Sequence, residues 1–450
     1  MTRDKLGAPP AQPGDTVTPQ AAVQKHPPEP HRGSCGRGTG GPLQGALGVW
    51  MIGALGSIAT TVIIGTLALR KGLTEPLGML TTGDPFKDMA LADLTAIEFG
   101  GCDIRPTEQR SVARQVLNLS DIADPAGCRE IENAFLQIVS RIDKGTARNC
   151  GDAIQQLTDS SVMRDCSLRE EVAEIRRCLQ QFKRERSLTE VVVVNLASTE
   201  PPLELDRCHM DLQAFETCLD RNDAAAVKAS TIYAYAAVRE GCPYINFTPS
   251  SGALVPAIIQ LAEKNKVPVM GNDGKTGETL VKSALAPMFT CRNLAVLSWE
   301  GFNILGNMDG SILRHPDNRE SKIKTKDQIL SRILGYAPHS RVHIDYVPSL
   351  DDQKTAWDFI HFKGFLGAKM SLQFVWQGYD SMLAAPLVLD LVRLADLAKR
   401  RGEGGLMPQL ACYFKAPLGV EEQRLYEQFK MLLDYAELAT ATRSHHEICV

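Results

Sequence analysis

Lysines are the residues of this sequence whose spacing points most directly to chemistry. The stretch RHPDNRESKIKTKDQ, residues 314–328, holds Lys322 and Lys326. Four residues apart, these two side chains share one face if the segment is helical. Two neighbouring ammonium groups can bind a phosphate or stabilise a developing oxyanion, and their repulsion lowers their pKa values towards the range useful for proton transfer. The alternative interpretation is a solvated basic loop.

Three further lysines lie in loops or at the ends of expected elements. They are Lys275 in GNDGKTG, Lys354 in DDQKTAW and Lys415 in YFKAPLG. Each one alone also fits an ordinary surface lysine. Whether the lysines meet depends on the elements that carry them.

Those elements alternate between strand-sized apolar runs and helical stretches. The runs EVVVVNL, PYINF and VPVMGN are separated by DAAAVKASTIYAYAAVREG and VPAIIQLAEKNK. The four consecutive valines lack polar alternation, as expected of a central strand that is buried on both faces. This order predicts an α/β fold with a doubly wound parallel sheet.

Small polar residues and glycines follow three successive strands of the predicted sheet. Ligands of such sheets bind at the carboxyl ends of the strands. We therefore expect a site among these residues, although turn chemistry explains any one group alone. The groups are Asn195, Ser198, Thr199 and Glu200; Asn246, Thr248, Pro249 and Ser250; and Gly271, Asn272, Asp273, Gly274 and Lys275.

The segment GVWMIGALGSIATTVIIGTLALRKG, residues 48–72, has no charge before Arg70. It is long enough to cross a membrane. It also reads as a strand, a glycine turn at Gly53 and Gly56, and a helix that receives a nucleotide. The spacing Gly53-x-x-Gly56-x-x-Ala59 matches the dinucleotide pattern loosely, so a plain buried helix stays open as a third interpretation. The glycine positions and the lack of another span favour the nucleotide site.

Composition sets limits on the class of protein. The 450 residues carry a net charge of -4, which gives no argument for binding nucleic acid or an anionic membrane. Twelve cysteines without a C-x-x-C pair predict reduced thiols in a cytoplasmic protein. Residues 1–45 are rich in proline and glycine, and we expect them to be disordered.

Five motifs, in order along the chain, resemble those of the myo-inositol-1-phosphate synthase family. The likeness covers residues 46–420, and FGGCDI, residues 99–104, also resembles the family's G-G-W-D-I. The five are GNDGKTGETLVKS (family G-D-D-x-K-S-G-Q-T), FNILGNMDG (Y-N-H-L-G-N-N-D-G), ESKIKTK (S-K-x-x-x-K), DSMLAAPLVLDL (D-S-x-L-A-x-P-L-I-x-D-L) and YFKAPL (Y-x-x-K-A-P-L).

The resemblance implies a Rossmann-like domain that binds NAD, with an inserted α+β catalytic and tetramerisation domain. It assigns residues 46–270 and 386–450 to the first and residues 271–385 to the second. It also implies a homotetramer that converts the sugar phosphate D-glucose 6-phosphate to 1D-myo-inositol 3-phosphate. In that reaction C5 is oxidised, the ketone enolises, C6 attacks the aldehyde, and reduction regenerates NAD.

The resemblance also carries site residues to positions of this chain. Lys326 is expected to transfer a proton at C5, and a cation is expected near Asp309. Catalytic candidates are Lys322, Lys326, Lys354, Lys415, Asp273 and Lys275. Cofactor-binding candidates are Gly53, Gly56, Ser57, Ile58, Asp103, Ser198, Thr199, Asp273, Asp309 and Asp380. Substrate-binding candidates are Asn303, Asn307, Lys322, Lys354 and Lys415.

Departures from the family pattern keep other functions open. The family's G-x-G-G-N-N-G is here GALGSIA, its N-G-S-P-Q-N-T is NFTPSSG, and Ile304 and Met308 replace His and Asn. An NAD-dependent dehydrogenase or a cyclase for a related sugar phosphate is the alternative. A non-catalytic sensor of NAD or an inositol phosphate is another, but retention of all four lysines argues against it.

Overall fold

The computed structural model describes residues 45–447, apart from 106–107, 159–161, 163–165, 251 and 253–254. The side chains of residues 321–328 and 442–447 are likewise outside the description. The tail predicted over 1–45 therefore lies, up to residue 44, outside the described residues.

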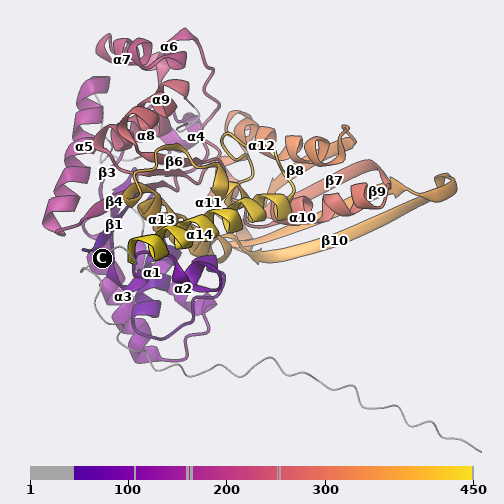
Figure 1. The fold of residues 1–450 in the computed structure, drawn as a ribbon, viewed down its shortest axis with the longest axis horizontal. Coiled ribbons are helices and arrows are strands. Elements are labelled where there is room, and N and C mark those ends of the chain that lie inside the picture. The colour runs from indigo at the N-terminus through magenta and orange to yellow at the C-terminus, as the bar shows by residue number, and fades with distance from the viewer. Residues whose placement is uncertain are drawn as a thin grey trace, which may run out of the picture. The chain divides into compact units, whose positions relative to one another are not determined.

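A seven-stranded parallel sheet is built from β1, β2, β3, β4, β5, β6 and β11 in the order β11-β6-β5-β4-β1-β2-β3 (Figure 1). Every neighbouring pair runs parallel. The predicted doubly wound sheet is thus confirmed. Its strands are β1 (Leu47–Ile52), β2 (Ile97–Asp103), β3 (Asp143–Lys144), β4 (Glu190–Asn195), β5 (Tyr244–Asn246), β6 (Pro268–Gly271) and β11 (Gly405–Leu406).

Helices cover both faces of this sheet. The α-helices are α1 (Ser57–Arg70), α2 (Gln109–Leu119), α3 (Pro125–Val139), α4 (Asp152–Gln155), α5 (Leu168–Glu185), α6 (Arg207–Met210), α7 (Leu212–Asp220), α8 (Ala229–Glu240), α9 (Pro256–Asn265), α10 (Glu278–Cys291), α11 (Met308–Ile312), α12 (Pro316–Leu334), α13 (Asp380–Arg400) and α14 (Leu425–Glu447). Among the described residues, no helix combines the length and apolar character that crossing a bilayer requires.

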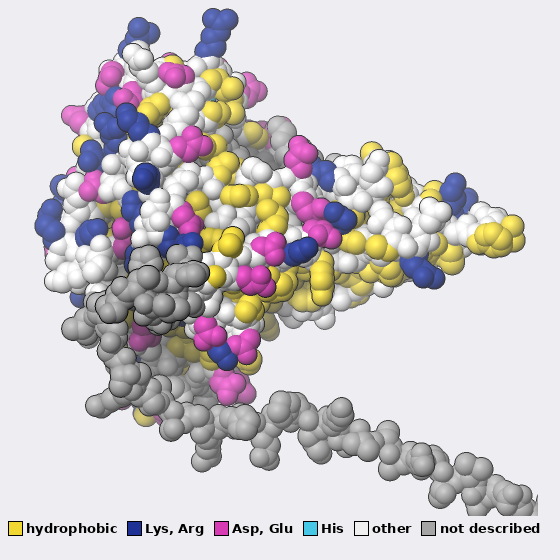
Figure 2. Space-filling view, viewed as in Figure 1, with side chains coloured by type: hydrophobic (Ala, Val, Ile, Leu, Met, Phe, Trp, Pro, Cys, Tyr) yellow, Lys and Arg dark blue, Asp and Glu magenta, His cyan; other side chains and the backbone are white. Residues whose placement is uncertain are grey.

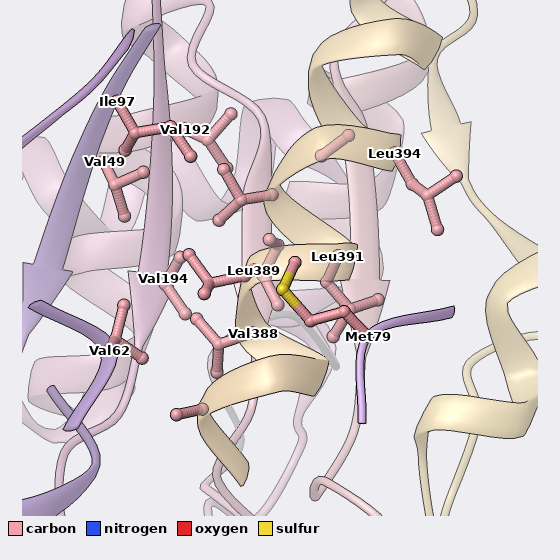
Figure 3. Close-up of a cluster of buried hydrophobic side chains, with 14 of the residues drawn as sticks. Val49, Val62, Met79, Ile97, Val192, Val194, Val388, Leu389, Leu391 and Leu394 are labelled. Atoms are coloured by element: carbon pink, nitrogen blue, oxygen red, sulfur yellow. The ribbon is translucent and has the colours of Figure 1, made fainter. Parts of the chain in front are cut away.

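The valines of β4 show why the sheet is covered twice. Val192 and Val194 point into one core, with side chains of α1 and α13, and Figure 3 shows this cluster. Val191 and Val193 point into the opposite core, with side chains of α5, α8 and α9. All four valines are buried, so the unbroken apolar run is the sequence signature of a central strand.

A second, four-stranded sheet has the order β10-β9-β7-β8. Its strands are β7 (Ala295–Leu305), β8 (His339–Tyr346), β9 (Gln353–Lys363) and β10 (Lys369–Tyr379). Helices α10 and α12 pack on one face through Phe289, Trp299 and Ile329. These strands fall within the segment 271–385, and α13 spans its end, so the predicted domain boundaries stay a prediction.

Helix α13 returns the chain to the first sheet through a buried polar contact. Asp390 accepts hydrogen bonds from the backbone N–H groups of Leu80 (2.8 Å) and Thr81 (3.1 Å) and from the Thr81 hydroxyl (2.5 Å). Arg393 donates to the Thr81 carbonyl oxygen at 3.0 Å. Residues far apart in the chain are joined by this network, and burial raises the pKa of Asp390.

We expect Asp390→Ala to lower the free energy of unfolding by about 3 kcal/mol, because buried donors at Leu80 and Thr81 lose their acceptor. Chemical denaturation measures the loss. The control Asp434→Ala, at an exposed position of α14, should stay within about 0.5 kcal/mol of the parent. Equal stability of the two variants would contradict this role for Asp390.

Candidate functional site

The carboxyl ends of the parallel strands open onto two adjoining pockets. Pocket A encloses about 720 Å³, its open mouth included, and is lined in part by Asp103 and Glu200. Pocket B encloses about 960 Å³, counted in the same way, and is lined in part by Asp273 and Lys415. Both pockets share the lining residues Gly53, Gly56, Arg105, Leu196, Ala197 and Ser198.

The loop between β1 and α1 places the N-terminus of α1 at the pocket wall, where the N–H groups of the first helical turn have no acceptor within the helix. Gly53 has φ +78°, and a Cβ there would lie 3.0 Å from Ala197 Cα, so only glycine suits both the turn and the close approach. Gly56 precedes α1 and offers no side-chain cap. The first-turn residues Ser57 and Ile58 line pocket B, and an uncapped helix N-terminus attracts an anion such as a pyrophosphate.

Asp103, the last residue of β2, holds this loop in place. Its carboxylate accepts hydrogen bonds from the backbone N–H groups of Leu55 and Ile104, both at 2.8 Å. Burial raises its pKa, and these hydrogen bonds oppose that rise. A carboxylate after the second strand is also where a dinucleotide fold meets the ribose. Asp103 therefore positions the glycine loop and lines the pocket that a ribose would enter.

These features fit NAD. The glycine loop leaves room for a pyrophosphate, the first turn of α1 supplies the donors, and Asp103 lines the pocket that a ribose would enter. Pocket A adds an apolar wall suited to an aromatic base, which includes Ile104, Ala147, Ile154 and Leu157. Gly53, Gly56, Ser57, Ile58 and Asp103 are thus brought to one place.

The loop after β4 adds the next predicted residues. Ser198 lines both pockets, and Thr199 is buried and lines pocket B. Glu200, which sequence reasoning placed at a strand end without giving it a role, lines pocket A. It accepts hydrogen bonds from the backbone N–H of Ser230 at 2.9 Å and from the Ser230 hydroxyl at 2.5 Å. Burial raises the pKa of Glu200 to about 7.

Lys415 and Asp273 form the buried ion pair of pocket B. The Lys415 Nζ atom lies 2.7 Å from Asp273 Oδ1, and both side chains are buried. The two residues also pair through the backbone, where Lys415 N donates to the Asp273 carbonyl oxygen at 2.7 Å. The loop after β6 and the segment before α14 therefore fix the ammonium group of Lys415 in the wall of pocket B.

Lys275 is buried beside this pair but points elsewhere. Its Nζ donates to Gln428 Oε1 on α14 at 2.5 Å, and it does not line pocket A or pocket B. Burial lowers the pKa of Lys275 to about 8, and the neighbouring charge of Lys415 adds to the effect. Its amine can thus exchange a proton near neutral pH, and its catalytic role stays a prediction.

A second group of polar side chains lies around Lys354. Its Nζ is 3.5 Å from Asp380 Oδ2, and Thr276 donates to Asp380 Oδ1 at 3.3 Å. Asp352 accepts from the Ser381 hydroxyl at 2.5 Å and from Asn307 Nδ2 at 3.4 Å. Burial raises the pKa of Asp352. Pocket B is also lined by Asn307, Asp309, Asp352 and Asp380.

Asp352 was missed from the sequence, although it stands two residues before Lys354 in the motif DDQK. An acidic residue beside a matched lysine is the signal that could have found it. Four carboxylates now line pocket B, and oxygen ligands of this kind suit a hard cation. The cation predicted near Asp309 stays a prediction.

Three predicted residues, Lys322, Lys326 and Asn303, are not among the side chains that the structure places in the two pockets. Lys322 and Lys326 belong to α12, but their side chains lie outside the described residues. Asn303 is buried on β7, where its Nδ2 donates to the His343 carbonyl oxygen at 3.3 Å, and it lines neither pocket. Their roles stay predictions.

Known proteins resemble this chain over most of its length. A family model for NAD binding, described as Myo-inositol-1-phosphate synthase, matches residues 47–436. Inositol-3-phosphate synthase 1 of Bacteroides thetaiotaomicron is 34% identical over 415 residues, which cover 87% of this chain and 95% of that protein. Inositol-3-phosphate synthase 1-A of Xenopus laevis is 30% identical over 399 residues, which cover 79% of this chain and 68% of that protein.

Solved structures agree with the fold. Inositol-3-phosphate synthase from Caenorhabditis elegans matches with a TM-score of 0.79 and 24% identity, over 88% of this chain and 86% of that chain. A myo-inositol-1-phosphate synthase-related protein from Thermotoga maritima matches with a TM-score of 0.72 and 26% identity. The match covers 87% of this chain and 98% of that chain.

The raised pKa of Glu200 makes stability depend on pH. From about pH 4.5 to 7 the folded state keeps a proton that the unfolded chain has released, so its stability falls as pH rises. Glu200→Gln cannot titrate. The free energy of unfolding of the variant, relative to that of the parent, should therefore rise between pH 5 and pH 7. The rise should be at most about 1.4 kcal/mol per pH unit.

Denaturation with urea at pH 5, 6, 7 and 8 measures this difference. Glu204→Gln is the matched control, because Glu204 lies in the same loop with an exposed side chain. Parallel pH profiles for Glu200→Gln and the parent protein would show that Glu200 is not a buried titrating group.

Proposed function

Because the chain belongs to the myo-inositol-1-phosphate synthase family, we propose that it converts D-glucose 6-phosphate to 1D-myo-inositol 3-phosphate with bound NAD. One observation carries the proposal. The uncapped N-terminus of α1 and the buried Lys415–Asp273 pair line the same pocket. A dinucleotide and a phosphorylated sugar can therefore meet there.

The two pockets suggest how the cofactor lies. Its adenosine half fits pocket A, between Asp103 and the apolar wall, and its pyrophosphate fits the glycine loop shared by both pockets. Asp273 and Lys415 of pocket B would then hold the nicotinamide half. When bound, NAD supplies the oxidation and the reduction that no side chain can perform.

The lysines at and near pocket B can stabilise the negative charge that develops during the reaction. Enolisation of a ketone next to a phosphate concentrates negative charge in a small volume. The ammonium group of Lys415, fixed by Asp273, can offset this charge. That of Lys354 lines neither pocket, but it lies 3.5 Å from Asp380 of pocket B and can add to the effect. Such groups act most strongly when they are preorganised and shielded from water.

Proton transfer completes the reaction. The family likeness assigns Lys326 to the proton at C5, and Lys322 to the phosphate or the oxyanion. Oxidation and reduction cancel within one cycle, so the net change is an isomerisation.

A related reaction is the second candidate, because one departure from the family pattern lies in the pocket itself. Met308, where the family has Asn, lines pocket B. A thioether in place of an amide removes a hydrogen-bonding partner for a sugar hydroxyl. A different sugar phosphate, or net dehydrogenation with build-up of NADH, is the outcome that this change favours.

An assay with glucose 6-phosphate and NAD tests the main proposal. We expect an inositol phosphate to form without net NADH, and Lys415→Met to lower kcat about 10²- to 10³-fold, by analogy with the loss of one oxyanion donor. The control Lys264→Met removes an exposed lysine of α9 and should keep the parent rate. Steady NADH accumulation would favour the dehydrogenase, and an unchanged rate for Lys415→Met would remove this lysine from the mechanism.

Self-association into a homotetramer belongs to the same proposal. The face of the four-stranded sheet that α10 and α12 leave open carries Trp357, Phe302 and Val375; Trp357 is 39% exposed and Val375 63% exposed. Phe302 stacks on Trp357 at 5.1 Å and on His343 at 4.4 Å between ring centroids. Hydrophobic side chains gather along the β9–β10 hairpin (Figure 2). A second copy of the chain, with the same aromatic face, is the occupant we propose.

Val375→Glu should shift the assembly towards smaller species, because it places a charge in that face. Light scattering after size-exclusion chromatography measures the mass. Leu77→Glu changes a side chain that is 81% exposed outside the sheet and should leave the mass unchanged. If Val375→Glu keeps the mass of the parent assembly, the sheet face is not the interface.

A further inference from the structure

A cluster of three charged side chains is buried between α10 and the four-stranded sheet. Glu278 and Lys282 lie four residues apart on α10, so they share one face of the helix. The Lys282 Nζ atom lies 2.5 Å from Glu278 Oε1 and 3.5 Å from Asp358 Oδ1 of β9. Each of the three side chains is at most 2% exposed. None of them lines pocket A or pocket B.

The strand β7 provides the room and a further contact for this cluster. Trp299 donates from Nε1 to Asp358 Oδ1 at 2.7 Å, and its ring centroid lies 5.9 Å from the Lys282 Nζ atom. Gly301 pairs with Asp358 across β7 and β9, and a Cβ at Gly301 would lie 2.6 Å from Glu278 Oε1. Glycine at this point of β7 therefore leaves space for the Glu278 carboxylate.

The charges of the cluster favour one arrangement of α10 on the sheet. Burial alone would lower the pKa of Lys282, but the two carboxylates outweigh burial and raise this pKa. A buried ammonium group that loses its partners is costly, so α10 cannot shift without breaking contacts that water would not replace. Glu278 stands where the family motif G-D-D-x-K-S-G-Q-T has glutamine, so this chain places two carboxylates against one ammonium group.

Both elements that carry the cluster lead to the candidate site. Helix α10 begins directly after the loop that carries Asp273 and Thr276, which line pocket B. On β9, Asp358 lies four residues after Lys354. Lys354 and Thr276 both contact Asp380 of pocket B, at 3.5 Å and 3.3 Å. The cluster therefore ties the loop after β6 to the start of β9.

We propose that Glu278, Lys282 and Asp358 are positioning residues, whose ion cluster sets the place of the Lys354 amine relative to the loop that carries Asp273. This role rests on the proposed function, because it concerns the same reaction. The three side chains line neither pocket, so they act through the loop and through Lys354. A misplacement of about 1 Å, caused by a change far from the chemistry, can lower a rate about 10²-fold.

In the alternative interpretation the cluster only stabilises the four-stranded sheet, and pocket B does not depend on it. Leu330→Ala is the control for that case. It removes buried apolar volume from the core of the same sheet, on α12, and changes no charge. Its loss of stability comes from a cavity, so it should keep the kcat of the parent.

Kinetics and hydrogen–deuterium exchange of the full chain test the proposal. Lys282→Met removes the charge and keeps most of the side-chain length, and we expect it to lower kcat about 10- to 10²-fold. Its affinity for NAD should change less than kcat, because pocket A belongs to strands of the other sheet. Backbone amides of residues 273–277 and 353–355 should exchange faster in Lys282→Met than in the parent.

Two further variants separate charge from folding. Glu278→Gln keeps an oxygen for Lys282 and leaves one carboxylate against one ammonium group, so it should keep the parent kcat. If Lys282→Met does not fold, Asp358→Asn replaces it, because the amide oxygen still accepts from Trp299 and only the charge is lost. The expected fall in kcat and the faster exchange are the same.

The exchange measurement does not depend on the reaction, so this proposal and the proposed function can fail separately. A parent protein that forms no inositol phosphate would remove the proposed function. Faster exchange of both segments in Lys282→Met, but not in Leu330→Ala, would still support the coupling. Unchanged exchange in Lys282→Met would overturn the proposal, and so would an active Lys282→Met protein with the kcat of the parent.

Discussion

A buried ammonium–carboxylate contact joins two segments that are 142 residues apart in the chain, at Lys415 and Asp273. Backbone hydrogen bonds accompany it, from Lys275 N to the Tyr413 carbonyl oxygen and between Asn272 and Ala416 in both directions. The end of β6 and the segment before α14 therefore form one wall. Without this pairing the ammonium group of Lys415 would have no fixed position in the wall of pocket B.

The described lysines of the site share a second property: each has an acceptor within the protein. Lys415 meets Asp273, Lys354 meets Asp380 and Lys275 meets Gln428. Burying a charge without a partner is costly, so these contacts make the cations tolerable in a protein interior. They also fix the orientation of each amine before substrate arrives, which is the condition for strong electrostatic stabilisation of a transition state.

Much of the fold follows from local pattern. The four valines of β4, the glycines at 53 and 56, and the alternation of strands and helices predict the parallel sheet and the turn, because each depends on neighbours in sequence. The site was harder to predict. Glu200 and Asp352 acquire their partners, Ser230 and Ser381, only through tertiary packing. Lys275 shows the converse, since its motif points to the site while its amine contacts α14.

The most direct test of the central claim follows the hydrogen at C5 of the sugar. Glucose 6-phosphate carrying deuterium at C5 is offered to the protein with unlabelled NAD, and the inositol phosphate is analysed by mass spectrometry. Oxidation and reduction at one site, within one cycle, predict that the deuterium is found at the same carbon of the product. Deuterium recovered in the free dinucleotide pool, with unlabelled product or none, would contradict the account.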